Sequence, residues 1–225
     1  EITDLAYKYS KDNADELVFY DISASTKNEV VETAWVKKVA DKINIPFCVA
    51  GGIKNIRVAE AILNLGADKI SINTPAIENP KLITELAKEF GSQCVVVGID
   101  SYFQDQQYNV YSRTGDPTTR TKSNRLTYSW IKEVQDRGAG EIVLNCMNQD
   151  GVRNGYDLKQ LFDARKISRV PLIASGGAGN MDHFYDVFNS CNVDGALAAS
   201  VFHKNEVGIE VLKNNLLNRG IKVRT

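Results

Sequence analysis

The chain has 225 residues, of which 43% are hydrophobic and 24% are charged, ordinary values for a globular protein. Its formal net charge is −1, so no large basic field is available to attract nucleic acid. No apolar run approaches the roughly 18 residues that a membrane-spanning helix needs, and we expect no signal peptide at the start. These properties exclude a nucleic-acid-binding module and a membrane-spanning protein.

Four cysteines are scattered along the chain without a CxxC pair, and the two histidines are too far apart to suggest a metal site. Three of the cysteines lie in or beside apolar runs. We therefore expect reduced core residues in a cytoplasmic protein, and neither a metal nor a cofactor. The cysteines are Cys48, Cys94, Cys146 and Cys191.

The chain opens with apolar residues at helical spacing, which predicts a helix from about Ile2 to Tyr9. Short β-rich apolar runs then alternate with longer amphipathic stretches. The predicted strands are residues 16–20, 46–50, 69–72, 94–99, 141–144, 171–174 and 195–198. The predicted helices are 29–41, 58–65, 80–90, 128–137, 157–166, 181–190 and 208–218. The polar stretch 102–123 is expected to be a long mobile loop.

Continuous apolar strands that alternate with helices indicate an α/β protein with a parallel sheet, either doubly wound or closed into a barrel. An internal repeat decides between the two. Residues 14–18 match 139–143 and residues 46–52 match 171–177, each pair 125 positions apart, and 67–74 match 193–200 at a spacing of 126. Three matches in one order indicate two duplicated (βα)4 halves, so we predict a single (β/α)8 TIM barrel over residues 1–225.

Only seven strands are predicted, and the strand that ends at Asp100 has no counterpart 125 positions earlier. We therefore expect that the first strand of the barrel, on roughly 25 residues, is missing from this chain. With it the barrel has about 250 residues, its typical size.

Active sites of such barrels lie at the carboxyl ends of the strands. There the sequence places Gly51-Gly52 and then Asn73-Thr74 in the first half, and Gly176-Gly177 and then Ala199-Ser200 in the second. Glycines let backbone N–H groups approach an anion, and hydroxyls add donors. The pattern predicts two phosphate sites and a substrate with a phosphate at each end. The alternative is that the glycines only permit tight turns.

Three aspartates are candidates for the mouth of the barrel. Asp100 follows an apolar strand and is the predicted general acid or base, unless it only caps the next loop. Asp21 follows the first predicted strand, where capping or orienting a neighbour is as consistent with the sequence as catalysis. Asp150, next to Gly151, lies in a loop that we expect to close over one phosphate.

Charged residues open three strands at the opposite end of the predicted barrel: Glu16, Lys69 and Glu141. Residues at this end are often merely solvated. A ring of mixed charge would also suit a gate to the interior of the barrel.

These strand ends resemble those of a known family, the cyclase subunit of imidazole glycerol phosphate synthase in histidine biosynthesis, especially its enterobacterial type. The resemblance covers nearly the whole chain and is carried by residues 15–22, 49–53, 66–73, 137–142, 148–157, 174–179 and 198–203. One departure is Asn148, where an acidic residue is common elsewhere in the family, although the enterobacterial type also has Asn.

The resemblance implies a lyase that works in a heterodimer with a glutaminase subunit. Ammonia from the glutaminase would pass through the barrel to a bound phosphoribulosyl-formimino aminoimidazole carboxamide ribonucleotide. The products would be imidazole glycerol phosphate and aminoimidazole carboxamide ribonucleotide.

The resemblance also assigns roles to residues of this chain. Asp100 matches one of two catalytic aspartates, and the other belongs to the missing strand. Asp68 would face the glutaminase, and the gate would be Glu16, Lys69 and Glu141, its arginine also lying in the missing strand. The phosphate contacts would be Gly52, Asn73, Thr74, Gly151, Gly177, Ala199 and Ser200.

Two other functions remain open at this stage. One is the isomerase of the preceding step, a related barrel that also binds two phosphates but needs neither ammonia nor a partner. The other is an ammonia-delivering partner of a synthase outside histidine biosynthesis. Such a protein would not need to keep Asp100 or both phosphate sites.

Overall fold

The structure is a computed structural model that describes residues 2–20 and 34–224. Two compact units are described, and each is considered by itself. The first takes in residues 2–20, 34–97, 112–121 and 136–140 of the described chain. The second takes in residues 98–111, 122–135 and 141–224. No helix in the described part of the chain is long and apolar enough to cross a membrane.

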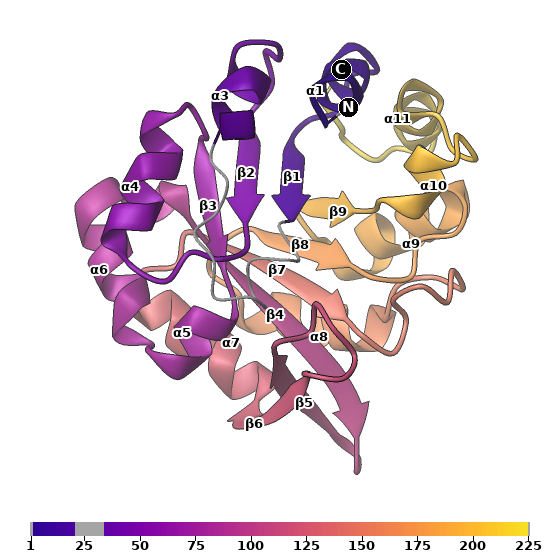
Figure 1. The fold of residues 1–225 in the computed structure, drawn as a ribbon. Coiled ribbons are helices and arrows are strands. Elements are labelled where there is room, and N and C mark those ends of the chain that lie inside the picture. Colours follow the sequence, from indigo (N-terminus) through magenta and orange to yellow (C-terminus); the bar gives the residue numbers. More distant parts are fainter. Residues whose placement is uncertain (1, 21–33, 225) are drawn as a thin grey trace. The chain divides into compact units, whose positions relative to one another are not determined.

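The first unit is built on parallel strands in the order β1-β2-β3-β4 (Figure 1). Its strands are β1 (Leu17–Tyr20), β2 (Phe47–Ala50), β3 (Lys69–Ile72) and the start of β4 (Val95–Gln104). Helix α4 packs against β3 and against α6 on the outer side of these strands. The helices are α1 (Ile2–Lys11), α3 (Ala34–Ala40), α4 (Ile56–Asn64), α5 (Thr74–Glu78) and α6 (Lys81–Phe90), with a 3₁₀ turn η1 (Ser92–Cys94).

The second unit continues the pattern in the order β4-β7-β8-β9, with β7 (Glu141–Cys146), β8 (Leu172–Ser175) and β9 (Gly195–Leu197). Helices α8 (Leu158–Ile167) and α9 (Met181–Cys191) pack against each other, and α9 also packs on β9. The remaining helices are α7 (Thr127–Asp136), α10 (Ser200–His203) and α11 (Ile209–Asn218).

Successive parallel strands are neighbours in each unit, and neither order reverses. A doubly wound sheet reverses its strand order at a switch point, whereas a barrel does not. The α/β class and the strand succession of a (β/α)8 barrel are therefore confirmed. A single domain over residues 1–225, and a further strand before residue 1, stay predictions.

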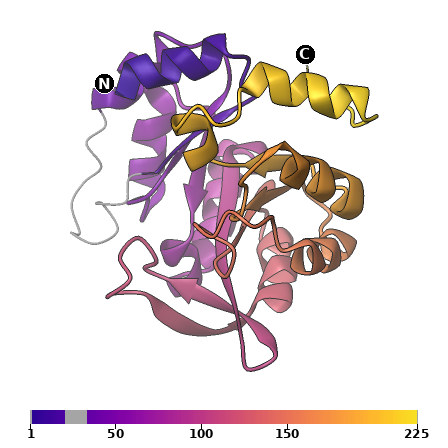
Figure 2. The same cartoon turned by 90° about the vertical axis from the view of Figure 1, so that its right-hand side faces the viewer.

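The segment 102–123 was predicted as a loop, and that prediction is wrong. Strand β4 continues to Gln104 and pairs antiparallel with β5 (Gln107–Ser112), which also pairs with β6 (Thr121–Leu126). Figure 2 shows the β4–β5 hairpin reaching away from the parallel strands. Aromatic rings pack across the hairpin and stabilise it: Phe103 lies tilted against Tyr108 and Tyr102 lies edge-to-face with Tyr111, with centroids 4.8 and 5.7 Å apart.

The four cysteines are all free, and Cys48, Cys146 and Cys191 are buried, as predicted. The apolar core follows the predicted strands. Ile70, Val95, Val97, Ile142 and Leu172 are all fully inaccessible to solvent.

The internal repeat reappears in the backbone conformation of the two units. Gly51 and Gly52 have φ of 105° and 66°, and their counterparts Gly176 and Gly177 have 89° and 115°, all in the left-handed region that favours glycine. Asn73 and Ala199, 126 positions apart, share φ values of −125° and −124°. The duplication therefore preserves the path of the chain where each strand ends.

The repeat also preserves one side-chain hydrogen bond. Asp68 accepts from the backbone N–H of Phe47 at 3.0 Å, and Asp194 accepts from that of Leu172 at 2.9 Å. Asp194 additionally contacts the guanidinium of Arg165, at 2.5 Å. The two aspartates therefore hold the starts of β2 and β8 in the same way, but only Asp194 has this added contact.

Replacing these aspartates with alanine should reveal that difference. Asp68→Ala and Asp194→Ala each lose a hydrogen bond to a strand, worth about 1 kcal/mol. Asp194→Ala also loses a half-exposed ion pair, worth up to about 1 kcal/mol. Urea unfolding should therefore give a larger loss of unfolding free energy for Asp194→Ala. Equal losses would show that the ion pair with Arg165 contributes nothing.

Candidate active site

The first predicted phosphate site lies at the ends of β2 and β3 in the first unit. The register of β2 and β3 ends with Ala50 paired to Ser71, so Gly52 lies two residues beyond the end of β2 and Asn73 directly follows β3. Thr74 follows Asn73 as the first residue of α5 and is half-buried. The three residues that the sequence predicted for this site therefore follow the ends of two neighbouring strands.

The structure adds Arg113 to this group, a residue that sequence reasoning missed. Its backbone N–H donates to Oγ1 of Thr74 at 2.9 Å, and its guanidinium contacts Glu78 at 2.9 Å. Because Oγ1 of Thr74 is the acceptor in this hydrogen bond, its own O–H group can still donate to another acceptor. No motif marks Arg113, which lies just beyond a hairpin that the sequence did not reveal.

The second predicted phosphate site is assembled in the second unit by a close approach of two loops. A Cβ at Gly177 would lie 2.1 Å from the carbonyl oxygen of Gly155, so only glycine fits. The N–H of Gly155 donates to the carbonyl of Gly177 at 2.8 Å. This contact ties the loop that carries Asp150 and Gly151, both exposed, to the end of β8.

Ala199 and Ser200 complete this site from the end of β9. The register of β8 and β9 ends with Ser175 paired to Leu197, so Gly177 and Ala199 each lie two residues beyond the end of their strand. Ser200 is the first residue of α10, and both Ala199 and Ser200 are exposed. The geometry repeats that of Gly52 and Asn73 in the other unit.

Asp100 lies where β4 changes its pairing. Val97 still pairs parallel with Ile72, whereas Asp100 pairs antiparallel with Tyr111. The carboxylate is half-buried and accepts a hydrogen bond from Nδ2 of Asn145 at 2.8 Å. A partly shielded carboxylate at a strand end is suited to proton transfer. Asp21, the other candidate, lies outside the described residues.

Three hydrogen bonds hold the β4–β5 hairpin to the loop beyond β7. Asn148 accepts from the N–H of Phe103 at 2.7 Å and donates to the carbonyl of Phe103 at 3.3 Å. The N–H of Met147 donates to the carbonyl of Ser101 at 2.9 Å. An amide can both donate and accept, which a carboxylate cannot, and this explains Asn at position 148.

Tyr108 connects the hairpin to the start of α8. Its hydroxyl donates to Asp157 at 3.1 Å, and Asp157 also caps α8 by accepting from the N–H of Gln160 at 3.0 Å. Burial, together with the negative charge of Asp157, raises the pKa of Tyr108 well above its ordinary value. Tyr108 therefore stays protonated and keeps donating throughout the physiological range.

The predicted gate is partly assembled. Lys69 and Glu16 form an ion pair of 2.7 Å, with side chains 21% and 28% exposed, at the starts of β3 and β1. This partial burial makes the pair stronger than a fully solvated one. Glu141 is the half-buried first residue of β7 in the second unit. Asp68, next to Lys69, is exposed.

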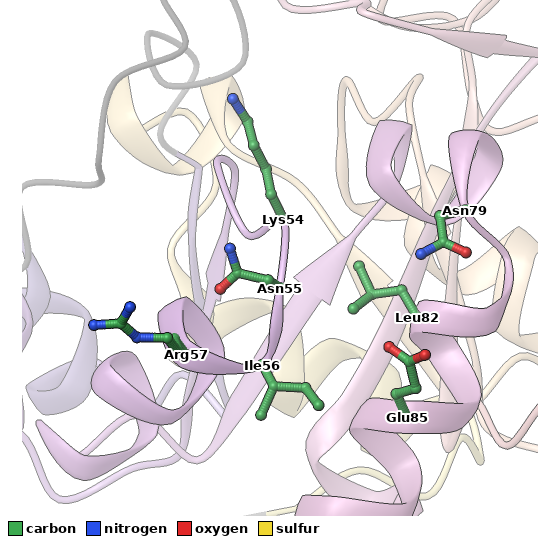
Figure 3. Close-up of a pocket in the computed structure, with 7 residues that line it drawn as sticks. All are labelled: Lys54, Asn55, Ile56, Arg57, Asn79, Leu82 and Glu85. Atoms are coloured by element: carbon green, nitrogen blue, oxygen red, sulfur yellow. The ribbon is translucent and has the colours of Figure 1, made fainter.

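A separate groove of about 280 Å³ lies between α4 and α6 in the first unit (Figure 3). Leu82 and Ile56 supply its apolar surface, and charged and amide side chains surround them. The groove contains none of the predicted site residues. Its lining residues are Lys54, Asn55, Ile56, Arg57, Asn79, Leu82 and Glu85.

The loop contact at Gly177 makes a testable prediction. Gly177→Ala should strongly destabilise the second unit, because its Cβ would overlap the Gly155 backbone at a φ of 115°. Gly151→Ala is the matched control, since it also has a positive φ, 75°, but its Cβ would meet nothing within 4 Å. The control should lose only about 1–2 kcal/mol of unfolding free energy. Similar losses in urea unfolding would contradict the predicted overlap.

Comparisons with known proteins agree with this geometry. Residues 1–208 match the family described as "Histidine biosynthesis protein". The imidazole glycerol phosphate synthase subunit HisF of Vibrio cholerae (strain O395) is 60% identical over 226 residues, which cover 100% of this chain and 88% of that protein. Subunits of the same name from Aliivibrio fischeri and Proteus mirabilis are 60% and 58% identical, with the same coverage. The chain therefore belongs to the histidine biosynthesis protein family.

Proposed function

We propose that this chain is the cyclase subunit of imidazole glycerol phosphate synthase, a lyase of histidine biosynthesis. It uses ammonia to convert phosphoribulosyl-formimino aminoimidazole carboxamide ribonucleotide into imidazole glycerol phosphate and aminoimidazole carboxamide ribonucleotide. The observation that carries the proposal is the repeated strand-end geometry: left-handed Gly-Gly turns after β2 and β8, and the same φ at Asn73 and Ala199 after the neighbouring strands. A substrate with a phosphate at each end matches two copies of one anion site, and HisF relatives at 60% identity support the same reaction.

In this proposal each phosphate is held by backbone N–H groups and hydroxyls. Gly52, Asn73 and Thr74 hold one phosphate, and the loop of Gly151, with Gly177, Ala199 and Ser200, holds the other. Left-handed glycines expose their N–H groups without a covering side chain, which suits an oxyanion. Asp150, exposed beside Gly151, moves with the loop that closes over the second phosphate.

Asp100 is the proposed general acid or base. Cyclisation requires protons to leave the incoming ammonia and to reach the departing group, and a carboxylate at the mouth of the barrel can carry one of them. Its half-buried position and its hydrogen bond from Asn145 fix the carboxylate in one direction. Fixed orientation lowers the cost of reaching the transition state.

Ammonia is proposed to come from a glutaminase subunit bound at the other end of the strands. The proposed gate residues are Lys69 and Glu16, which form an ion pair at the starts of β3 and β1, and Glu141, the first residue of β7. Asp68 is proposed to contact the glutaminase. In the repeat, Asp194 meets Arg165, whereas the position that corresponds to Arg165 is Ala40. The Asp68 carboxylate is therefore better placed to meet a cation from outside the chain. The four free cysteines fit a cytoplasmic location.

The decisive assay supplies the formimino substrate with an ammonium salt at high pH, where free ammonia is abundant. The chain should produce imidazole glycerol phosphate without a partner. Asp100→Asn should lower kcat by at least about 100-fold, because the proton carrier is lost, while phosphate-dependent binding remains. Asp105→Asn, the same change in the exposed hairpin turn, is the control and should keep full activity.

Two outcomes would overturn the proposal. Isomerisation of the preceding substrate without ammonia would identify the chain as the pathway's isomerase. If the formimino substrate stayed unconverted in the presence of an active glutaminase subunit, the chain could only have an ammonia-delivering role. Retained activity in Asp100→Asn would remove Asp100 from its role.

The partner proposal is tested by Asp68→Asn, which keeps an oxygen acceptor for the Phe47 N–H but removes the negative charge. Ammonia-dependent turnover should be unchanged, whereas glutamine-dependent turnover and affinity for the glutaminase should fall. Asp163→Asn, on α8, is the control, and neither activity should change. Unaltered glutamine-dependent turnover in Asp68→Asn would show that Asp68 does not contact the glutaminase.

A further inference from the structure

We propose that Asn145 is a positioning residue that holds the Asp100 carboxylate in its reactive direction, and that Ser175 in turn holds Asn145. Neither residue was predicted from the sequence. The inference rests on the proposed function, because it assigns Asn145 a role through Asp100.

The first step is the contact itself. Asn145 Nδ2 lies 2.8 Å from Oδ1 of Asp100, a short distance for an amide and a carboxylate. The contact is partly buried, so water competes with it only weakly. A hydrogen bond to a charged acceptor is stronger than a neutral one, and it restricts rotation of the carboxylate.

The second step concerns the direction of the amide. An ionised carboxylate only accepts hydrogen bonds, so Asn145 must present its NH₂ group to Asp100. Its Oδ1 then faces Ser175, whose hydroxyl donates to it at 3.3 Å. Ser175 thus donates to Asn145, and Asn145 donates to Asp100. These two hydrogen bonds together set the orientation of the Asn145 amide.

The third step is the strand geometry. Asn145 and Ser175 are direct partners in the parallel register of β7 and β8, so their side chains stand on one face. A Cβ at Gly176 would lie 3.0 Å from Asn145 Oδ1 and 2.9 Å from the Cys146 carbonyl. Glycine at position 176 therefore leaves room for the amide as well as for the turn.

An amide is well suited to this task. It orients the carboxylate by donating one proton, yet it brings no positive charge that would neutralise Asp100. A lysine or arginine there would form an ion pair and compete with the substrate for the carboxylate. The network thus fixes geometry and leaves the charge of Asp100 available for proton transfer.

The test is a set of variants assayed with the formimino substrate and ammonium salt. Asn145→Leu keeps the branched shape of the side chain but removes the donor. It should lower kcat by roughly 10- to 100-fold with KM within about two-fold of the wild type, because a misdirected carboxylate affects the reaction more than binding. Asn145→Thr, which keeps a hydroxyl donor, should recover part of the lost kcat. Asn124→Leu on exposed β6 is the control for the substitution.

A double-mutant cycle separates positioning from a general loss of structure. Ser175→Ala should lower kcat less than Asn145→Leu, and combining the two should add little, since both act through one contact. Additive effects would overturn the proposed chain of donors. A KM that rises as much as kcat falls would also overturn it.

A crystal structure of Asn145→Leu gives a readout that does not depend on turnover. The Asp100 carboxylate should leave its wild-type rotamer or occupy more than one. An unchanged Asp100 would overturn the positioning role even if the wild type proved inactive with the formimino substrate. Wild-type activity with an unaffected Asn145→Leu variant would overturn this role alone and leave the proposed function standing.

Discussion

The candidate site depends on the register between neighbouring parallel strands. A parallel register fixes which strand-end residues stand side by side, and a shift of one residue would turn each side chain to the other face. The observed register pairs Ala50 with Ser71, Ser175 with Leu197, and Asn145 with Ser175, and so aligns the ends of neighbouring strands. Buried apolar side chains on these strands hold the register, so the core determines the chemistry at the strand ends.

Duplication gives the two units the same backbone and leaves the side chains free to diverge. Both carry a left-handed Gly-Gly turn, after β2 and after β8, and both tie the start of that strand with an aspartate. The side chains differ most informatively around the two matching aspartates, Asp68 and Asp194. Asp194 meets Arg165 within its own unit, whereas Ala40 stands at the matching position near Asp68. Because the backbone around the two aspartates is otherwise repeated, this difference indicates that Asp68 has a function that Asp194 does not share.

The sequence predicted the parallel strands and the glycine turns at their ends because apolar runs and glycine pairs are local signals, which the internal repeat reinforced. It missed the β4–β5 hairpin, since the Asp105-Gln106 turn, with φ of 54° and 61°, lacks the glycine that usually marks such a turn. It also missed Asn145 and Arg113, because each acts through a neighbour distant in sequence. A polar residue inside a strand carries no motif until the register brings its partner beside it.

The hairpin has a structural consequence for Asp100. A parallel strand that ended at Asp100 would leave the backbone beyond it without fixed partners, and the carboxylate would share that freedom. Here β4 continues and pairs Asp100 with Tyr111, and Asn148 binds the Phe103 backbone in both directions. Asn148 also belongs to the loop that carries Gly151. The proposed general acid or base and one proposed phosphate loop are thereby fixed to the same hairpin, so a movement of that loop would act directly on the segment that carries Asp100.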